Sequence, residues 1–113
     1  MKGIGIDIVE MERMEQLVDN EKFVDRVLTP KEKALMDQHH GVRRKEFLAG
    51  RYACKEAFSK AYGTGIGEVE FQALEILRNE KGAPYFNQSP YQGEVLVSIS
   101  HTKDIAIAEV YLV

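Results

Sequence analysis

Two carboxylates and a lysine stand out because their types and spacing suit work on a charged ligand. Asp7 lies in an alternating apolar segment, whereas Glu56 and Lys60 lie four residues apart in a segment with helical spacing. Residues four apart share one face of a helix, so Glu56 and Lys60 are predicted to point the same way. Asp7 and Glu56 would be hard oxygen ligands for Mg²⁺, which takes one or two protein carboxylates and accepts phosphate oxygens.

Each of these residues also has a simpler interpretation. A Glu–Lys pair at this spacing is most often a surface ion pair worth about 0.3–0.5 kcal/mol. Asp7 could be held by backbone hydrogen bonds or by a salt bridge, because burying an unpaired carboxylate is costly. The sequence leaves open whether Asp7 and Glu56 meet in space.

Basic residues and a glycine-rich segment surround the Glu56–Lys60 pair. Arg51 and Lys55 precede it, and Gly63-Thr64-Gly65-Ile66-Gly67 follows. Glycine-rich loops let backbone amides approach phosphates, but this one follows a helix and lacks a Walker A lysine. A helix C-cap with a simple turn is the alternative interpretation. His101 follows a strand pattern and could face an anion, or it could simply end the strand.

The spacing of apolar residues predicts the elements that must position these groups. Helical patterns cover residues 10–19, a segment from the capping sequence Thr29-Pro30-Lys31-Glu32 to about Gln38, and residues 44–62. Strand patterns cover residues 3–9, 71–77, 85–86, 95–101 and 105–112. Residues 21–28 are predicted to be a connecting segment, and His39 and His40 polar loop residues. One strand, about three helices and an antiparallel β region define an α+β fold.

Composition bounds the class of protein. A chain of 113 residues with 44% hydrophobic and 29% charged residues is typical of one globular domain, residues 1–113. Its one cysteine, Cys54, falls on a predicted buried stripe and excludes an intrachain disulfide. We expect a soluble, cytoplasmic protein, since no apolar run approaches the roughly 20 residues of a membrane span and no signal-peptide pattern is present.

Charge is unevenly distributed along the chain. Residues 13–60 carry 11 Lys and Arg against 8 Asp and Glu, although the whole chain has a net charge of −3. This excess indicates a basic face for an anionic partner, or a solvated surface with charges placed by chance. A sequence pI of 5.6 argues against a nucleic-acid partner.

Nearly the whole chain resembles one known family, the holo-[acyl-carrier-protein] synthases, which are short 4′-phosphopantetheinyl transferases. The most specific match is the run from Glu46 to Ala61, with Lys-Glu-Ala-Phe-Ser-Lys-Ala at its end, followed by Gly-Thr-Gly-Ile-Gly. The other matching segments are Gly3 to Glu10, Phe23 to Arg26 with Leu28 and Thr29, Gly82-Ala83-Pro84, and Val97 to Thr102. Cys54 departs from the family's usual alanine, at a packing position.

The resemblance implies transfer of the phosphopantetheine arm of coenzyme A to a serine of apo acyl carrier protein, releasing adenosine 3′,5′-bisphosphate, in support of fatty acid biosynthesis. It implies that Asp7 and Glu56 bind Mg²⁺ and that Lys60 stabilises developing charge. The base that accepts the serine proton is left open between Glu56 and a water molecule on the metal.

Further positions match the family's binding residues. Those that match residues around the coenzyme are Arg43, Arg51, Lys60, Gly63, Thr64, Gly65, Pro84 and His101. Those that match the region gripping the acidic carrier are Arg13, Phe23 and Arg26. The family's small members are trimers with sites at subunit interfaces, so the resemblance also implies a homotrimer.

Two other classes of function stay open on the residues alone. The first is a non-catalytic module that docks an acidic partner through its basic helices. The second is a metal-dependent phosphohydrolase, in which water replaces the serine. Failure to bind Mg²⁺ and coenzyme A would favour the module, and consumption of coenzyme A without a carrier would favour the hydrolase.

Overall fold

The computed structural model describes residues 2–63 and 69–113. Over these residues the chain forms four α-helices, a short 3₁₀ helix and five strands. The helices are α1 (Met11–Leu17), α2 (Glu21–Val27), α3 (Pro30–Met36), α4 (Val42–Tyr62) and the 3₁₀ helix η1 (Phe71–Ala73). The strands are β1 (Gly3–Glu10), β2 (Glu75–Arg78), β3 (Pro84–Gln88), β4 (Val95–His101) and β5 (Ile105–Leu112). The α+β class is confirmed.

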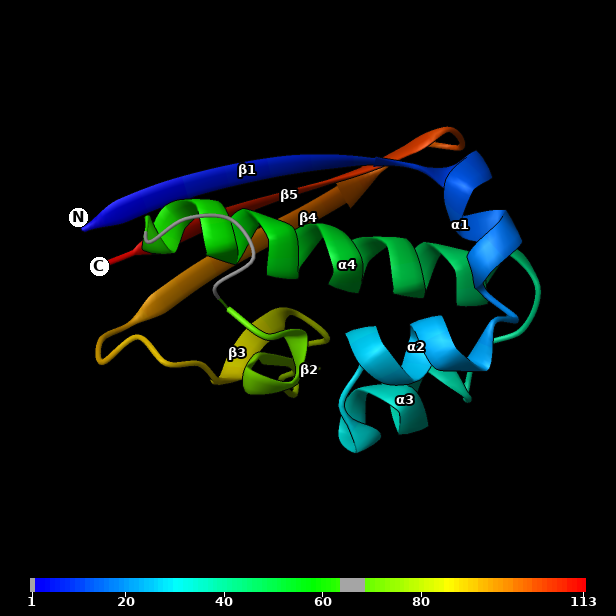
Figure 1. The fold of residues 1–113 in the computed structure, drawn as a ribbon, viewed down its shortest axis with the longest axis horizontal. Helices are drawn as coiled ribbons and strands as arrows, with labels where there is room; N and C mark the ends of the chain where they lie inside the picture. Colours follow the sequence, from blue (N-terminus) through cyan, green and yellow to red (C-terminus); the bar gives the residue numbers. More distant parts are fainter. Residues whose placement is uncertain (1, 64–68) are drawn as a thin grey trace.

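An antiparallel sheet and one long helix form the centre of the molecule. The sheet has the strand order β1-β5-β4, and β2 and β3 form a separate antiparallel pair. Helix α4 lies along one face of the three-stranded sheet, with α1–α3 at one end and β2–β3 on its other side (Figure 1). Strand β1 starts opposite the end of β5, where Gly3 pairs with Leu112, so the two ends of the chain lie side by side.

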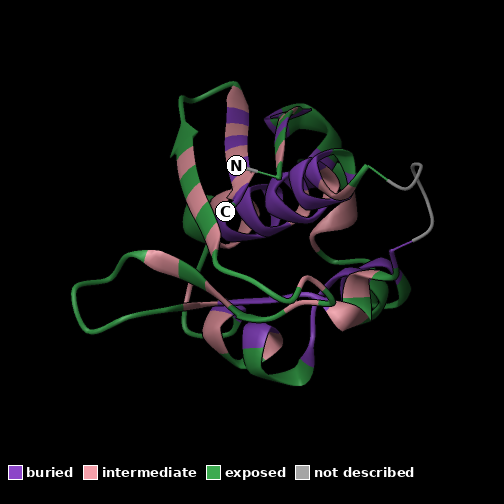
Figure 2. Ribbon diagram, turned by 90° about the vertical axis from the view of Figure 1, so that its left-hand side faces the viewer, coloured by how far each residue is buried: buried purple, intermediate pink, exposed green. Residues whose placement is uncertain are grey.

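The two faces of the sheet differ sharply. On the inner face, the alanines and Val110 of β5 are buried beneath α4, whose inward side is the most continuously buried part of the chain (Figure 2). The alternation predicted for β1 is confirmed, but its isoleucines line the outer face, where Ile4, Ile6 and Ile8 are 54%, 50% and 59% exposed. Asp7 therefore points with Gly5 and Val9 toward α4.

Glycines in β1 bring the strand unusually close to α4. A Cβ atom at Gly5 would lie 1.9 Å from the carbonyl oxygen of Ala57, and one at Gly3 would lie 2.0 Å from that of Ala61. Only glycine allows such a backbone approach. The close packing places Asp7, two residues beyond Gly5, beside the last turns of α4.

Helices α3 and α4 match their predictions. Thr29 caps α3, and with Glu32 it forms the capping box that the sequence indicated. Helix α4 ends at Gly63, which adopts a left-handed conformation with φ of 75°. Cys54 is wholly buried on α4, and burial raises the pKa of its thiol to about 12, which confirms a packing role.

Two predicted elements need correction. Residues 21–27 form the helix α2 rather than a connection, because the Asn20 side chain caps it and Phe23, Val24 and Val27 are buried on one side. The strand predicted for 71–77 begins as the 3₁₀ helix η1 and becomes β2 only at Glu75. Among the described residues, no helix is both long enough and apolar enough to cross a membrane.

Candidate active site

Strand β1 and helix α4 bring Asp7 and Lys60 into contact. The Lys60 ammonium donates to Asp7 Oδ1 at 3.1 Å and to the carbonyl oxygen of Ile6 at 3.0 Å. Among the described residues, the ion-pair partner of Lys60 is Asp7, not Glu56. The simple interpretation of Glu56 and Lys60 as an isolated surface pair is therefore wrong, and a salt bridge does hold Asp7.

Glu56 lies close enough to Asp7 for the two carboxylates to interact. Partial burial raises the pKa of Glu56 above its usual value, and the negative charge of Asp7 raises it further, whereas Lys60 and Arg13 oppose the shift. Two hard oxygen donors in a partly desolvated position suit a divalent cation. No third metal-ligating side chain joins them in the described parts of the chain, so water and phosphate oxygens would complete such a site.

Several residues expected around a coenzyme line a second feature, a pocket of about 250 Å³ on the other side of α4. Arg43, Arg51, Pro84 and His101 all line it. His101 ends β4, and its Nδ1 lies 3.6 Å from Glu46 Oε2. This clustering brings together positions from α4, β3 and β4 that are far apart in the sequence.

Arg51 is the most constrained cation of this pocket. Its side chain is 4% exposed, its Nε donates to the carbonyl oxygen of Ile76 at 3.0 Å, and its guanidinium lies 4.3 Å from the Phe47 ring centroid. Its Nη2 is buried without a hydrogen-bond partner in residues 2–63 and 69–113. An unpartnered buried guanidinium nitrogen at a pocket suits an anionic ligand such as phosphate.

Among the pocket residues that sequence reasoning missed are His39 and the cation Arg78. Arg78 Nη2 lies 3.1 Å from His39 Nε2, and the pKa of His39 is lowered by burial and by the charges of Arg78 and Arg43. A neutral His39 accepts the arginine's hydrogen bond and orients it. Arg78 directly follows the segment 71–77 that was predicted as a strand, and this position was the available signal.

Helix α4 separates the pocket from the carboxylates. The helix touches β4 where Gly50 meets Ile99, and it touches β1 where Ala57 meets Gly5. It thus crosses the sheet diagonally, with Arg51 facing the β4 side and Asp7, Glu56 and Lys60 on the β1 side. Within one chain, none of these three residues lines the Arg51 pocket.

The remaining predicted residues have mixed outcomes. Lys55, one of the basic residues that precede the Glu56–Lys60 pair, is wholly buried and does not face a ligand surface. Gly63 caps α4, and Thr64 and Gly65 lie outside the described residues.

Arg13, Phe23 and Arg26 form one cluster on α1 and α2. The guanidiniums of Arg13 and Arg26 lie 5.2 Å and 5.5 Å from the Tyr52 and Phe23 ring centroids. Phe23 is only 8% exposed and its ring centroid lies 5.7 Å from that of Tyr52, so Phe23 supports Arg26 directly and Arg13 through Tyr52.

Fold and sequence together define the class of protein. A sequence profile of the 4′-phosphopantetheinyl transferase superfamily matches residues 3–110. A holo-[acyl-carrier-protein] synthase of Enterococcus faecalis is 53% identical over 99% of this chain and 97% of its own length. One of Streptococcus sanguinis is 50% identical over 99% of this chain and 94% of its own length.

Solved structures agree. A crystal structure of a holo-(acyl-carrier-protein) synthase from Bacillus anthracis, in complex with CoA (3′,5′-ADP), superposes with a TM-score of 0.90 and 46% identity, covering 98% of this chain and 95% of that one. The Helicobacter pylori synthase in complex with coenzyme A gives a TM-score of 0.83 and 36% identity, over 97% and 99% of the two chains. The chain belongs to the holo-[acyl-carrier-protein] synthases of the 4′-phosphopantetheinyl transferase superfamily.

Proposed function

We propose that this chain transfers the 4′-phosphopantetheine group of coenzyme A to a serine of apo acyl carrier protein, releasing adenosine 3′,5′-bisphosphate. The observation that carries the proposal is the combination of the Asp7–Glu56–Lys60 cluster with a pocket whose buried Arg51 has no partner for Nη2 in the described part of the chain. The coenzyme complexes of the Bacillus anthracis and Helicobacter pylori relatives agree with it. The single buried cysteine fits a cytoplasmic setting, where the product carrier would serve fatty acid biosynthesis.

Asp7 and Glu56 are the residues that would hold Mg²⁺. Their proximity and the raised pKa of Glu56 describe a position where a divalent cation relieves the repulsion between two carboxylates. When bound, such a cation neutralises the diphosphate oxygens of coenzyme A and so lowers the barrier to phosphoryl transfer. The ligand set is oxygen only, as Mg²⁺ prefers.

The side chains of this cluster have separate tasks in the transfer. The serine oxygen forms a bond to the pantetheine-side phosphorus, and the bond from that phosphorus to the oxygen of the adenosine phosphate breaks. The Glu56 carboxylate accepts the serine proton, and Lys60 stabilises the charge that develops on the diphosphate and the leaving phosphate. The ion pair with Asp7 holds the Lys60 ammonium in place before substrate arrives.

The pocket provides cations for the adenosine end of the coenzyme. The guanidinium groups of Arg51 and Arg43 are suited to bind the phosphates of the coenzyme, and Pro84 and His101 line the pocket from β3 and β4. Gly63, Thr64 and Gly65 are proposed to contact the same ligand by the family's pattern. Arg13 and Arg26, supported by Phe23, are proposed to contact the acidic carrier.

We also propose a homotrimer whose sites are shared between copies. Ile4, Ile6 and Ile8 present an exposed apolar ridge on the outer face of the sheet, which a second copy would cover. A neighbour could also bring its own Arg51 pocket opposite the carboxylates, which α4 keeps apart within one chain. Both observations support the trimer implied by the resemblance.

The test is the intact mass of an apo acyl carrier protein after incubation with this chain, coenzyme A and Mg²⁺. We expect a gain of one phosphopantetheine, abolished by a chelator, by Asp7→Ala and by Glu56→Ala. An unchanged carrier with intact coenzyme A and a folded enzyme would contradict the proposal and favour a binding module. Coenzyme A consumed without a gain on the carrier would indicate a hydrolase.

A further inference from the structure

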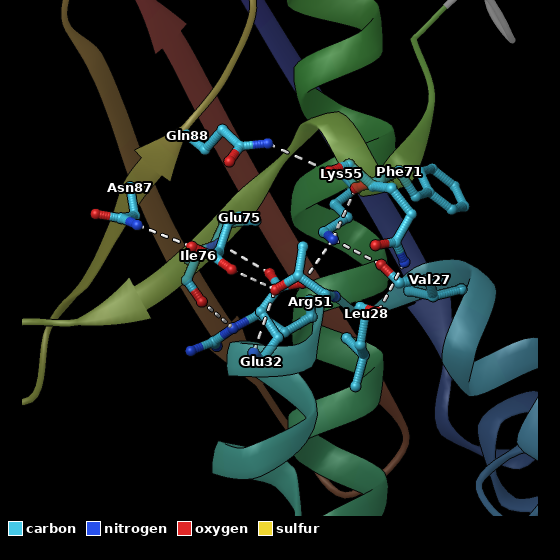
Figure 3. A network of polar contacts seen from close by, with 12 residues as sticks. Val27, Leu28, Glu32, Arg51, Lys55, Phe71, Glu75, Ile76, Asn87 and Gln88 are labelled. Carbon is cyan, nitrogen blue, oxygen red and sulfur yellow. Dashed lines mark hydrogen bonds and ion pairs between the residues drawn. The ribbon is translucent and has the colours of Figure 1, made fainter.

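Lys55 is a charged residue buried in the interior, next in the chain to Glu56. Its ammonium donates to the carbonyl oxygens of Val27 and Phe71 at 2.6 Å and 3.0 Å, and to Glu32 Oε1 at 2.6 Å (Figure 3). Lys55 and Glu32 are both 0% exposed. All three ammonium hydrogens therefore have partners, and none is available to a ligand.

The Lys55–Glu32 pair belongs to a larger buried polar network. Glu32 Oε2 accepts from the backbone amide of Ile76 at 2.8 Å, which connects α3 to β2. The Thr29 hydroxyl donates to Glu75 Oε2 at 2.5 Å, and the Asn87 amide donates to Glu75 Oε1 at 2.8 Å, which extends the network to β3. Helix α4 is thus connected, directly or through Glu32 and its neighbours, to α2, α3, η1, β2 and β3 (Figure 3).

Val27 and Phe71, whose carbonyl oxygens accept from Lys55, belong to two segments that lie next to Glu56 in the folded chain. Val27 is the last residue of α2, directly after Arg26, and Phe71 starts η1. Arg26, Phe71 and Glu56 line a common groove of about 500 Å³. A second connection joins the same two segments, since Gln72 Nε2 donates to the carbonyl oxygens of Asp25 and Leu28 at 2.7 Å and 2.8 Å.

We propose that Lys55 is a positioning residue for the carrier substrate. It fixes the end of α2, with the carrier-facing Arg26, at a set distance from the Glu56 carboxylate on the adjacent residue of α4. An apolar side chain could fill the same volume, but it would leave the carbonyl oxygens of Val27 and Phe71 without their donor. The inference rests on the proposed transfer reaction, and it deepens that reaction by naming how the carrier's serine is aligned.

We expect a substitution of Lys55 to lower kcat/KM for the carrier and to leave coenzyme A affinity unchanged. The proposed carrier cations lie on α1 and α2, whereas Arg43, Pro84 and His101 lie on the other side of α4 and have no hydrogen bond to Lys55 in the described residues. Arg51 is connected to the network through the Ile76 backbone, and Glu32→Gln keeps a side-chain oxygen that can accept from the Ile76 amide. A displaced α2 would misalign the serine, and a misplacement of about 1 Å costs on the order of tenfold to a hundredfold in rate.

The test uses the Lys55→Met/Glu32→Gln double variant, which removes both buried charges together and so leaves no unpaired ion. Transfer is measured over a range of apo carrier concentrations, at a temperature where circular dichroism shows the variant folded. Coenzyme A affinity is measured by calorimetry with Mg²⁺. We expect kcat/KM for the carrier to fall about tenfold or more, with coenzyme affinity within about twofold of wild type.

Two further variants separate positioning from general destabilisation. Val110→Ala, in the buried sheet core, lowers stability without touching the network and should leave both values unchanged. Gln72→Ala, at an exposed position, removes the second connection and should lower carrier kcat/KM in the same direction, even if the double variant fails to fold. A folded double variant with wild-type carrier kinetics, or an unaffected Gln72→Ala, would overturn the proposal, whereas a wild-type chain without transfer activity would overturn the proposed function itself.

Discussion

Glu56 combines two influences that an isolated glutamate would not feel. Burial disfavours its ionised form, and Asp7 adds a second negative charge nearby. A carboxylate whose pKa is raised is protonated at a higher pH than usual, so any step that needs ionised Glu56 weakens earlier as the pH falls. We therefore expect Mg²⁺ binding to weaken on acidification through the raised pKa that Glu56 has in the metal-free chain, because the proton competes with the cation for the same carboxylate.

The contribution of Asp7 to this shift can be isolated. Replacing Asp7 with asparagine removes the neighbouring charge but keeps the size of the side chain, so the pKa of Glu56 should move down toward its usual value. The measurement is the pH titration of the Glu56 carboxyl carbon by NMR, in metal-free samples of both proteins. An unchanged titration midpoint in Asp7→Asn would show that burial alone accounts for the shift.

Lys60 offers a second test at the level of one side chain. Lys60→Ala should lower kcat by about 10²-fold, because it removes a cation aimed at developing phosphate charge. Lys33→Ala is the matched control, since Lys33 forms an exposed ion pair with Asp25 at 2.8 Å, far from the carboxylate cluster in sequence and on another helix. Steady-state kinetics that showed equal effects of the two substitutions would contradict the role of Lys60.

At the scale of elements, the approach of β1 to α4 determines where Asp7 lies. Gly5→Ala would force a methyl group against the backbone oxygen of Ala57, which cannot rotate away. We expect a loss of about 3 kcal/mol or more in the free energy of unfolding, with transfer activity falling as Asp7 shifts. Urea denaturation measures the first and the carrier mass assay the second.

Gly50→Ala is the matched control for that change in stability. Gly50 lies inside α4, where a Cβ atom would meet Ile99 at an ordinary 3.4 Å. Alanine favours a helix interior over glycine by about 1 kcal/mol, so this variant should be as stable as wild type or more so. If both variants lost similar stability, close backbone packing would not be the special property of Gly5.

The same scale shows what the sequence could and could not predict. Helices α3 and α4 and strand β1 were predictable because a capping box, a C-cap glycine and alternating residues are local signals. Helix α2 was missed because its seven residues carry little periodicity and depend on burial against the rest of the molecule. The residue types of the site were predictable from the sequence. The burial of Lys55 and the place of Arg78 in the pocket were not, because both depend on packing between residues far apart in the chain.

At the scale of the whole molecule, the proposed sharing of active sites between copies predicts how a mixture of two inactive variants behaves. Asp7→Ala and Arg43→Glu should each be inactive alone, because each damages a different half of the site. Unfolded, mixed in equal amounts and refolded together, they should recover about one quarter of wild-type activity, since random assembly of a cyclic trimer pairs two intact halves in about one site of four. Recovery of no activity, in mixtures shown to be assembled, would place both halves of each site on one chain.

The diagonal course of α4 has a further consequence for how transfer activity depends on protein concentration. In the proposed trimer, a chain whose two half-sites face opposite directions gains a working centre only by meeting another copy. Turnover per chain should then fall on dilution below the dissociation constant of the assembly, and it should rise more steeply than linearly with expression level. Abundance would thereby act as a threshold on carrier modification, without any dedicated effector.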